Sequence, residues 1–204
     1  QVEVDGGIVS SNAHRLRRLL RKGVQLCGVI KGNAFGHGLV PAARALQEGG
    51  ADWLGVDSLE EALALRQGNI SVPLLVLYWS NPWEAPVMAA LDIQPSVWQE
   101  AWVVSAAAAL KAAESVDVLK VHVVVDTGLG REGCMLPEAL PLAHAVLAAG
   151  KAGVAIQIAG VSSHFCCPSD GVATQGHWRE VQQVHSSIVH LLQHSSIEVQ
   201  QVHS

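Results

Sequence analysis

The stretch Val24-Gln-Leu-Cys-Gly-Val-Ile-Lys-Gly-Asn-Ala-Phe-Gly-His-Gly38 decides the fold class, because it joins an apolar run to a lysine and a glycine-rich loop. The run Val24–Ile30 is typical of a strand buried on both faces. A segment with helical periodicity, around Pro41–Gln47, follows the loop. A strand, a loop and a helix in this order form the βα unit of parallel sheets. We therefore predict an α/β protein.

Five further apolar runs of similar length recur along the chain, each followed by an Ala/Leu-rich segment. They are Trp53–Val56, Val72–Leu77, Ile93–Val97, Val116–Val125 and Val154–Val161. About six βα units are compatible with a doubly wound open sheet or with a (β/α)8 barrel. A barrel needs about 250 residues, so a chain of 204 residues would stop near the seventh strand.

Composition excludes several classes of protein. Half of the residues are apolar and 15% are charged, so most of the chain is expected to be folded. The net charge of −5 argues against binding to nucleic acid, and the basic run Arg15–Lys22 is interpreted as a solvated helix face opposite a buried stripe of Leu16, Leu19 and Leu20. No apolar stretch reaches the roughly 18 residues of a membrane span. The chain starts at Gln1 rather than Met, and we expect it to be part of a longer protein.

Cysteines and histidines do not indicate a metal site. The four cysteines lack C-x-x-C spacing, which suits neither a zinc site nor a disulfide framework and favours a reducing, intracellular compartment. His190 and His194 are one helical turn apart, but we interpret them as part of a solvated face.

Lys31 is the first candidate for chemistry. It ends an apolar run, at the edge of a parallel sheet where functional side chains gather. Partial desolvation there favours the neutral, nucleophilic amine, which can form a Schiff base.

Two more candidates follow later strands. Asp126-Thr-Gly-Leu-Gly-Arg-Glu-Gly133 contains the G-x-G-x-x-G spacing of dinucleotide-binding loops, but the acidic residue expected about 20 positions later is missing. We keep a nicotinamide-dependent oxidoreductase as a minor alternative and favour Arg131 as a fixed planar cation. His164, in Gly160-Val-Ser-Ser-His-Phe165, is expected at the same edge as Lys31 and Arg131.

Four segments in order resemble the alanine racemase family. They are Val29-Ile-Lys-Gly-Asn-Ala-Phe-Gly-His-Gly38, Ala51-Asp-Trp-Leu-Gly-Val with Leu59-Glu-Glu-Ala-Leu63, Asp126-Thr-Gly-Leu-Gly-Arg131, and Gly160-Val-Ser-Ser-His-Phe165. Ser58-Leu-Glu-Glu61, which overlaps the second segment, also predicts a helix capping box. The resemblance implies an incomplete (β/α)8 barrel, with residues 1–204 as the N-terminal, pyridoxal-phosphate-binding domain and the C-terminal β-domain absent.

The resemblance also implies roles for individual residues. Lys31 would hold pyridoxal 5'-phosphate covalently and act as one of two acid/base groups. Arg131 would face the phenolic oxygen of the cofactor and the carboxylate of the substrate. His164 would stack on the pyridine ring, and Leu77 would pack near it.

This chain departs from the family pattern at three places. Phe35 replaces the tyrosine that binds the cofactor phosphate, and Val124 replaces a lysine, often carbamylated, that helps to orient the arginine. The tyrosine that serves as the opposite-face base belongs to the C-terminal β-domain and is donated across a dimer. The H-x-x-N-S phosphate segment of the family would begin near His203.

The expected function is therefore the interconversion of L- and D-alanine, by a cytoplasmic homodimer that makes D-alanine for the cell wall. The fragment alone is expected to be inactive. Alternatives are a broader-specificity or serine racemase, another fold-type-III pyridoxal-phosphate enzyme, or a non-catalytic barrel that binds the cofactor or a partner protein.

Overall fold

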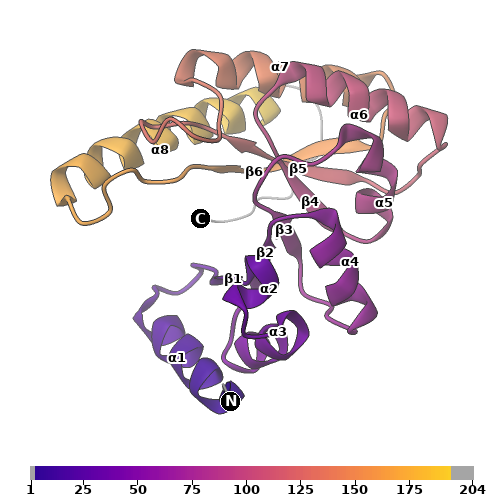
Figure 1. Cartoon of the computed structure of the whole chain (residues 1–204). Coiled ribbons are helices and arrows are strands. Elements are labelled where there is room, and N and C mark those ends of the chain that lie inside the picture. Colours follow the sequence, from indigo (N-terminus) through magenta and orange to yellow (C-terminus); the bar gives the residue numbers. More distant parts are fainter. Residues whose placement is uncertain (1–2, 194–204) are drawn as a thin grey trace. The chain divides into compact units, whose positions relative to one another are not determined.

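The computed structural model describes residues 3–193, and all six predicted strands are present in it (Figure 1). The strands are β1 (Cys27–Val29), β2 (Trp53–Val56), β3 (Leu74–Val76), β4 (Ile93–Val97), β5 (Leu119–Val124) and β6 (Ile156–Ser162). The helices are α1 (Gly6–Leu19), α2 (Lys31–Phe35), α3 (Leu39–Glu48), α4 (Leu59–Gln67), α5 (Ala85–Ala90), α6 (Glu100–Ala112), α7 (Ala139–Lys151) and α8 (Gly171–Gln193), with short 3-10 turns at Pro82–Glu84 and Leu136–Glu138. This alternation confirms the α/β class. His194, His203 and the predicted start of a seventh strand lie outside the described residues.

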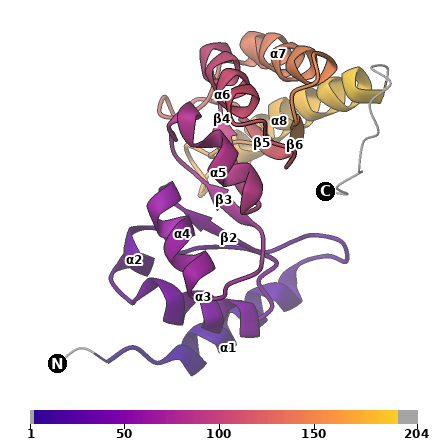
Figure 2. The ribbon, with the colours of Figure 1, turned by 90° about the vertical axis from the view of Figure 1, so that its right-hand side faces the viewer.

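The chain forms two compact units, of which the first covers residues 3–80 and 91–94. Its strands β1, β2 and β3 pair in parallel, with Cys27 opposite Trp53 and Leu54 opposite Leu74. Helix α3 packs beside α1, and α4 packs against β2 and β3 (Figure 2). The fully buried side chains of this unit include Leu54, Val56, Leu65, Leu74 and Val76.

Helix α1 differs from its prediction. Leu16 and Leu19 are 55% and 80% exposed, so the expected buried leucine stripe is wrong. The physical reason is a close approach through small residues: Ala13 is the buried residue of α1, and a Cβ added to Gly49 would lie 2.5 Å from the Cβ of Ala13. One cation of the basic run is not simply solvated, since Arg17 donates to the carboxylate of Asp52 at 2.9 Å.

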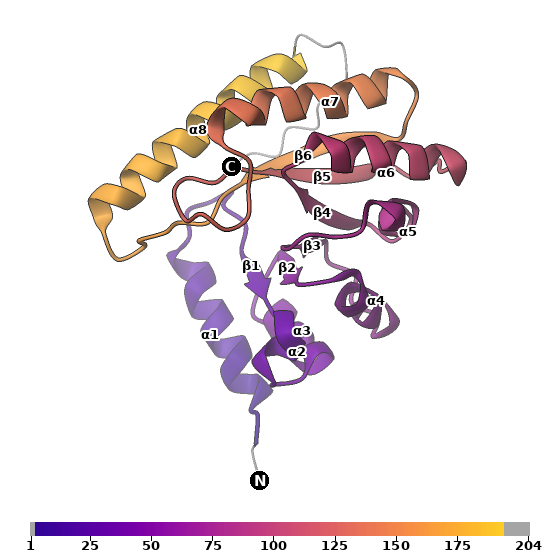
Figure 3. The ribbon, with the colours of Figure 1, turned by 45° about the horizontal axis from the view of Figure 1, so that its top comes forward.

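The second unit covers residues 81–90 and 95–193. Its strands β4, β5 and β6 are parallel, with Ser96 opposite His122 and Leu119 opposite Ile156. Helices α6 and α7 lie side by side, and both α7 and α8 contact β6 (Figure 3). The buried core includes Leu119, Val121, Val123, Leu142, Val146 and Ile188.

Burial on both faces is wrong for two of the predicted strands. Cys27 and Val29 of β1 are exposed, and β6 is only half-buried beyond Ile156. Among the described residues β1 pairs with β2 alone and β6 with β5 alone, so each has a partner strand on one side only. None of the helices within residues 3–193 has the length and apolar character needed to span a bilayer.

Candidate functional site

Lys31 stands two residues beyond β1, where the backbone turns with left-handed geometry. Gly32, Asn33 and Ala34 have φ/ψ of 61/44°, 56/43° and 54/46°, and φ of Phe35 is 55°. Residues other than glycine lose about 1–2 kcal/mol each in this conformation. Such strain persists only where surrounding contacts determine it, and it clusters at functional sites. The predicted glycine-rich loop is therefore a strained turn with Lys31 at its start.

Side-chain contacts hold this turn from several directions. The Oδ1 atom of Asn33 accepts the N–H of Leu39 at 2.8 Å, and the Nδ1 atom of His37 lies 2.7 Å from the carbonyl oxygen of Ala34. The N–H of Asn33 donates to Oε1 of Glu61 at 2.8 Å. These contacts come from residues that follow the turn and from α4.

The amine of Lys31 lies between a phenol and a carboxylate. Its Nζ is 2.7 Å from Oη of Tyr78 and 4.2 Å from the centre of the same ring. Oδ1 of Asp57 lies 3.7 Å from Nζ; this oxygen is buried and has no hydrogen-bond partner among the described residues. The lysine side chain is 25% exposed, which matches the predicted partial desolvation. Sequence reasoning missed Tyr78 and Asp57, although both follow the ends of strands.

The two apolar residues proposed for the cofactor lie in the same unit as Lys31. Leu77 donates its N–H to the carbonyl of Val56 at 2.8 Å, and a Cβ added to Gly55 would lie 3.0 Å from its side chain. Glycine on β2 therefore leaves room for this leucine. Phe35 is 68% exposed and has no hydroxyl group, so it can offer a surface but no hydrogen bond to a phosphate.

In the second unit, the loop after β5 is organised by Asp126. Its Oδ1 accepts the N–H groups of Gly128, Leu129 and Gly130 at 2.9–3.1 Å. These hydrogen bonds, that of Gly130 first, hold the pKa of Asp126 below its ordinary value. The N–H groups that a dinucleotide phosphate would need are therefore already used by a carboxylate, which argues against the nicotinamide alternative.

This loop brings Arg131 to His164, as the sequence predicted. Nη2 of Arg131 lies 3.1 Å from Nδ1 of His164, and its Nε donates to the Glu132 carboxylate. A guanidinium can only donate, so Nδ1 of His164 accepts and the ring carries its proton on Nε2. Oγ1 of Thr127 lies 3.0 Å from Oγ of Ser163, which ties together the loops after β5 and β6. Val124, at the end of β5, is buried and apolar.

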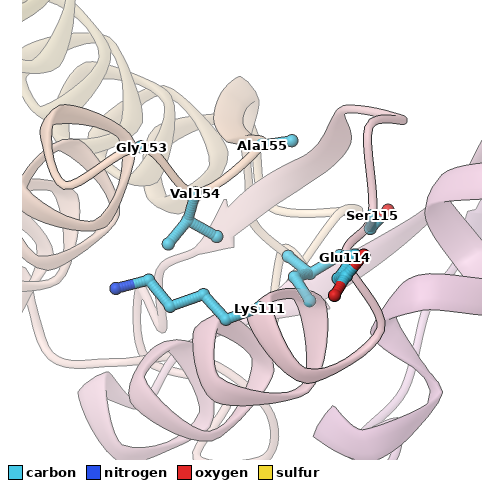
Figure 4. A pocket seen from close by; sticks show the side chains of 7 residues that line it. Lys111, Glu114, Ser115, Gly153, Val154 and Ala155 are labelled. Atoms are coloured by element: carbon cyan, nitrogen blue, oxygen red, sulfur yellow. The ribbon is translucent and has the colours of Figure 1, made fainter.

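The second unit also has a hollow of about 300 Å³, and Figure 4 shows the residues that line it. It is lined by Leu110, Lys111, Glu114, Ser115, Gly153, Val154 and Ala155. The lining residues precede β5 and β6, whereas Arg131 and His164 follow those strands. The hollow therefore lies at the opposite end of the strands from the predicted site and contains none of its residues.

Comparison with known proteins identifies the family to which this chain is similar. The family model for the N-terminal domain of alanine racemase matches residues 4–204. The chain is 36% identical to an alanine racemase of Lactiplantibacillus plantarum over 165 residues, or 81% of the chain. It is 41% identical to an alanine racemase of Beutenbergia cavernae over 172 residues, or 82% of the chain. It spans only 44% and 43% of those two relatives.

Solved structures give the same result for the fold. Alanine racemase from a D-cycloserine-producing Streptomyces lavendulae superposes with a TM-score of 0.78 at 33% identity. The Bacillus anthracis enzyme with bound L-Ala-P superposes with a TM-score of 0.77 at 30% identity. Each match covers 96% of this chain and about half of the solved chain, 50% and 48%. The fold is therefore part of a (β/α)8 barrel, which decides between the two architectures that the strand pattern left open.

Proposed function

This chain belongs to the alanine racemase N-terminal domain family, and from that membership we propose that it is the barrel domain of a longer pyridoxal-phosphate-dependent racemase. The reaction would interconvert L- and D-alanine. The observation that carries the proposal is the placement of Lys31: a partly desolvated amine at a strand end, held between Tyr78 and Asp57 on a strained turn.

The residues present fit the reactive part of pyridoxal phosphate. A covalent link needs an amine, which Lys31 supplies beside a buried carboxylate oxygen of Asp57 that lacks a hydrogen-bond partner within residues 3–193. The phenolic oxygen of the cofactor needs a cation, and its ring needs a flat neighbour. Arg131 and His164 provide this cation and this flat ring, in contact with each other, in the second unit. Once bound, the cofactor supplies a conjugated ring that accepts the electron pair left at the substrate Cα. The phosphate fits less well, because Phe35 offers it no hydrogen bond.

Each residue then has a defined task. Lys31 would hold the cofactor and, once freed by the substrate, would remove or return the Cα proton on one face. Arg131 would hold the substrate carboxylate and the phenolic oxygen through its planar fork of donors, and the contact of its Nη2 with His164 limits its rotation. His164 would stack on the ring, and Leu77 would pack beside it.

Racemisation needs a second base on the opposite face of the substrate. In the family this base is a tyrosine of the C-terminal domain, donated by a second subunit. We therefore propose that the complete protein works as a homodimer, in the cytoplasm, and makes D-alanine.

Val124 favours a second candidate, a racemase of broader specificity. A buried valine stands where the family often has a charged lysine derivative, so Arg131 is oriented by other groups here. A changed arginine position would alter the space for the substrate side chain. Serine offered in parallel with alanine distinguishes the two candidates.

The test is loss of the Cα hydrogen in deuterated buffer. We expect the full-length natural protein, supplied with pyridoxal phosphate, to exchange the Cα hydrogen of alanine and to convert L-alanine to D-alanine. Lys31→Ala should abolish both reactions, whereas Lys111→Ala, on α6, should leave them unchanged. A wild-type protein that exchanges neither alanine nor serine would refute the racemase proposal.

A further inference from the structure

The carboxylate of Glu61 joins the loops that follow two neighbouring strands of the first unit. Its Oε1 accepts the N–H of Asn33 at 2.8 Å, and its Oε2 accepts the N–H of Asp57 at 3.0 Å. Asn33 belongs to the left-handed turn after β1, and Asp57 follows β2 directly. Both oxygens of one side chain are thus committed to backbone groups beside Lys31.

The predicted capping box explains how Glu61 comes to this place. Half of the box is present, since Oγ of Ser58 accepts the N–H of Glu61 at 3.3 Å. In a capping box the glutamate would return to the N–H of Ser58. Here the carboxylate reaches past Ser58 to Asp57 and Asn33. Because side chains in the first turn point toward the start of the helix, α4 aims this carboxylate at the two loops.

These hydrogen bonds act on two features that determine the surroundings of the lysine amine. The first is the turn after Lys31, in which Asn33, Ala34 and Phe35 adopt positive φ without being glycine. The second is Asp57, whose Oδ1 lies 3.7 Å from Nζ of Lys31. A bond from a backbone N–H to an ionised carboxylate is stronger than one to a neutral acceptor. Removal of the Glu61 carboxylate would therefore loosen both the turn after Lys31 and the loop that carries Asp57.

We propose that Glu61 is a positioning residue that places the Lys31 amine, by joining the strained turn after β1 to the Asp57 loop after β2. The inference rests on the proposed function for its chemical meaning. The hydrogen bonds by which Glu61 joins the two loops do not need a cofactor.

The test uses Glu61→Gln and a matched control, Glu60→Gln, which removes the same charge from an exposed position in the same helical turn. Glutamine retains one acceptor oxygen and turns an amide nitrogen toward the other N–H. In the cofactor-free protein, hydrogen exchange followed by mass spectrometry should be faster in the peptide that spans residues 31–38 of Glu61→Gln. With pyridoxal phosphate added, the covalent adduct on Lys31 should form about tenfold more slowly, as expected for the loss of one charge-assisted hydrogen bond. Glu60→Gln should match the wild type in both measurements.

A second variant separates positioning from general loss of stability. Ala34→Gly removes the Cβ at a left-handed position, so the turn needs less support. If Glu61 acts through the turn, adding Ala34→Gly to Glu61→Gln restores much of the rate of adduct formation. A glutamate that merely stabilises α4 would not respond to this change. Failure of that rescue, or an exchange rate equal to that of the control, would overturn the inference, while a wild-type protein without any adduct would overturn the proposed function instead.

Discussion

Tyr78 and Asp57 both approach the Lys31 amine, yet the motif analysis singled out neither. The motifs drew attention to glycines, basic residues and histidines, whereas these two side chains sit beyond β3 and β2 without a distinctive pattern around them. The general rule that functional groups gather at the carboxyl ends of parallel strands would have found both. Lys31, Arg131 and His164 could be chosen from the sequence, because each lies in a recognisable motif that follows an apolar run. Contacts between loops could not be predicted from the sequence, because they depend on how the fold brings the loops together.

Tyr78→Phe tests the contact between the phenol and the lysine. The variant keeps the ring 4.2 Å below Nζ and removes the hydroxyl that lies 2.7 Å from it. We expect the covalent adduct of Lys31 with pyridoxal phosphate to form about three- to tenfold more slowly, because one hydrogen bond no longer fixes the amine. Stopped-flow absorbance measures the rate. Trp79→Phe is the control, and equal rates for Tyr78→Phe and the wild type would exclude a role for the hydroxyl.

At the scale of elements, strands were easier to predict than the turn that carries the lysine. Apolar runs bounded by polar residues gave all six strands, because burial in a parallel sheet leaves a continuous apolar signal. The left-handed turn gave no such signal, since Ala34 and Phe35, two of its residues, do not favour positive φ. The exposed leucines of α1 escaped prediction for a related reason: Ala13 and Gly49 make the contact, and small residues contribute little to hydrophobic periodicity.

A second prediction concerns His122 of strand β5. The ring is half-buried opposite Gly160 of β6, where an added Cβ would lie 2.7 Å from its Nδ1, and desolvation lowers the pKa of His122 to about 4. The unfolded chain binds a proton near pH 6.5 and the folded chain does not, so stability is lost as pH falls from 6.5 toward 4. The loss for this group is about 3 kcal/mol in total.

Urea unfolding at several pH values between 7.5 and 4.5 measures this loss. His122→Gln removes the titrating group, so its free energy of unfolding should fall less steeply with acidification than that of the wild type. His190→Gln, at an exposed position on α8, should keep the wild-type slope. Parallel slopes for His122→Gln and the wild type would contradict the assignment.

At the scale of the whole molecule, family membership and fold rest on different observations from those that support the site. The family model spans nearly the whole chain, and the barrel relatives superpose on 96% of it. The chain nevertheless spans less than half of its curated relatives. Under the proposed function, this chain would contribute Lys31 with its neighbours in the first unit, and Arg131 with His164 in the second. The account therefore depends most on the identity of the lysine that receives the cofactor.

Borohydride trapping tests that identity directly. The protein is incubated with pyridoxal phosphate, reduced and digested, and the pyridoxyl group is located by mass spectrometry. The account predicts that Lys31 carries the label, that Lys31→Ala prevents it, and that Glu60→Gln leaves it in place. A label on Lys111, Lys120 or Lys151 at the expense of Lys31, or no label at all, would contradict the assignment of Lys31 as the cofactor lysine.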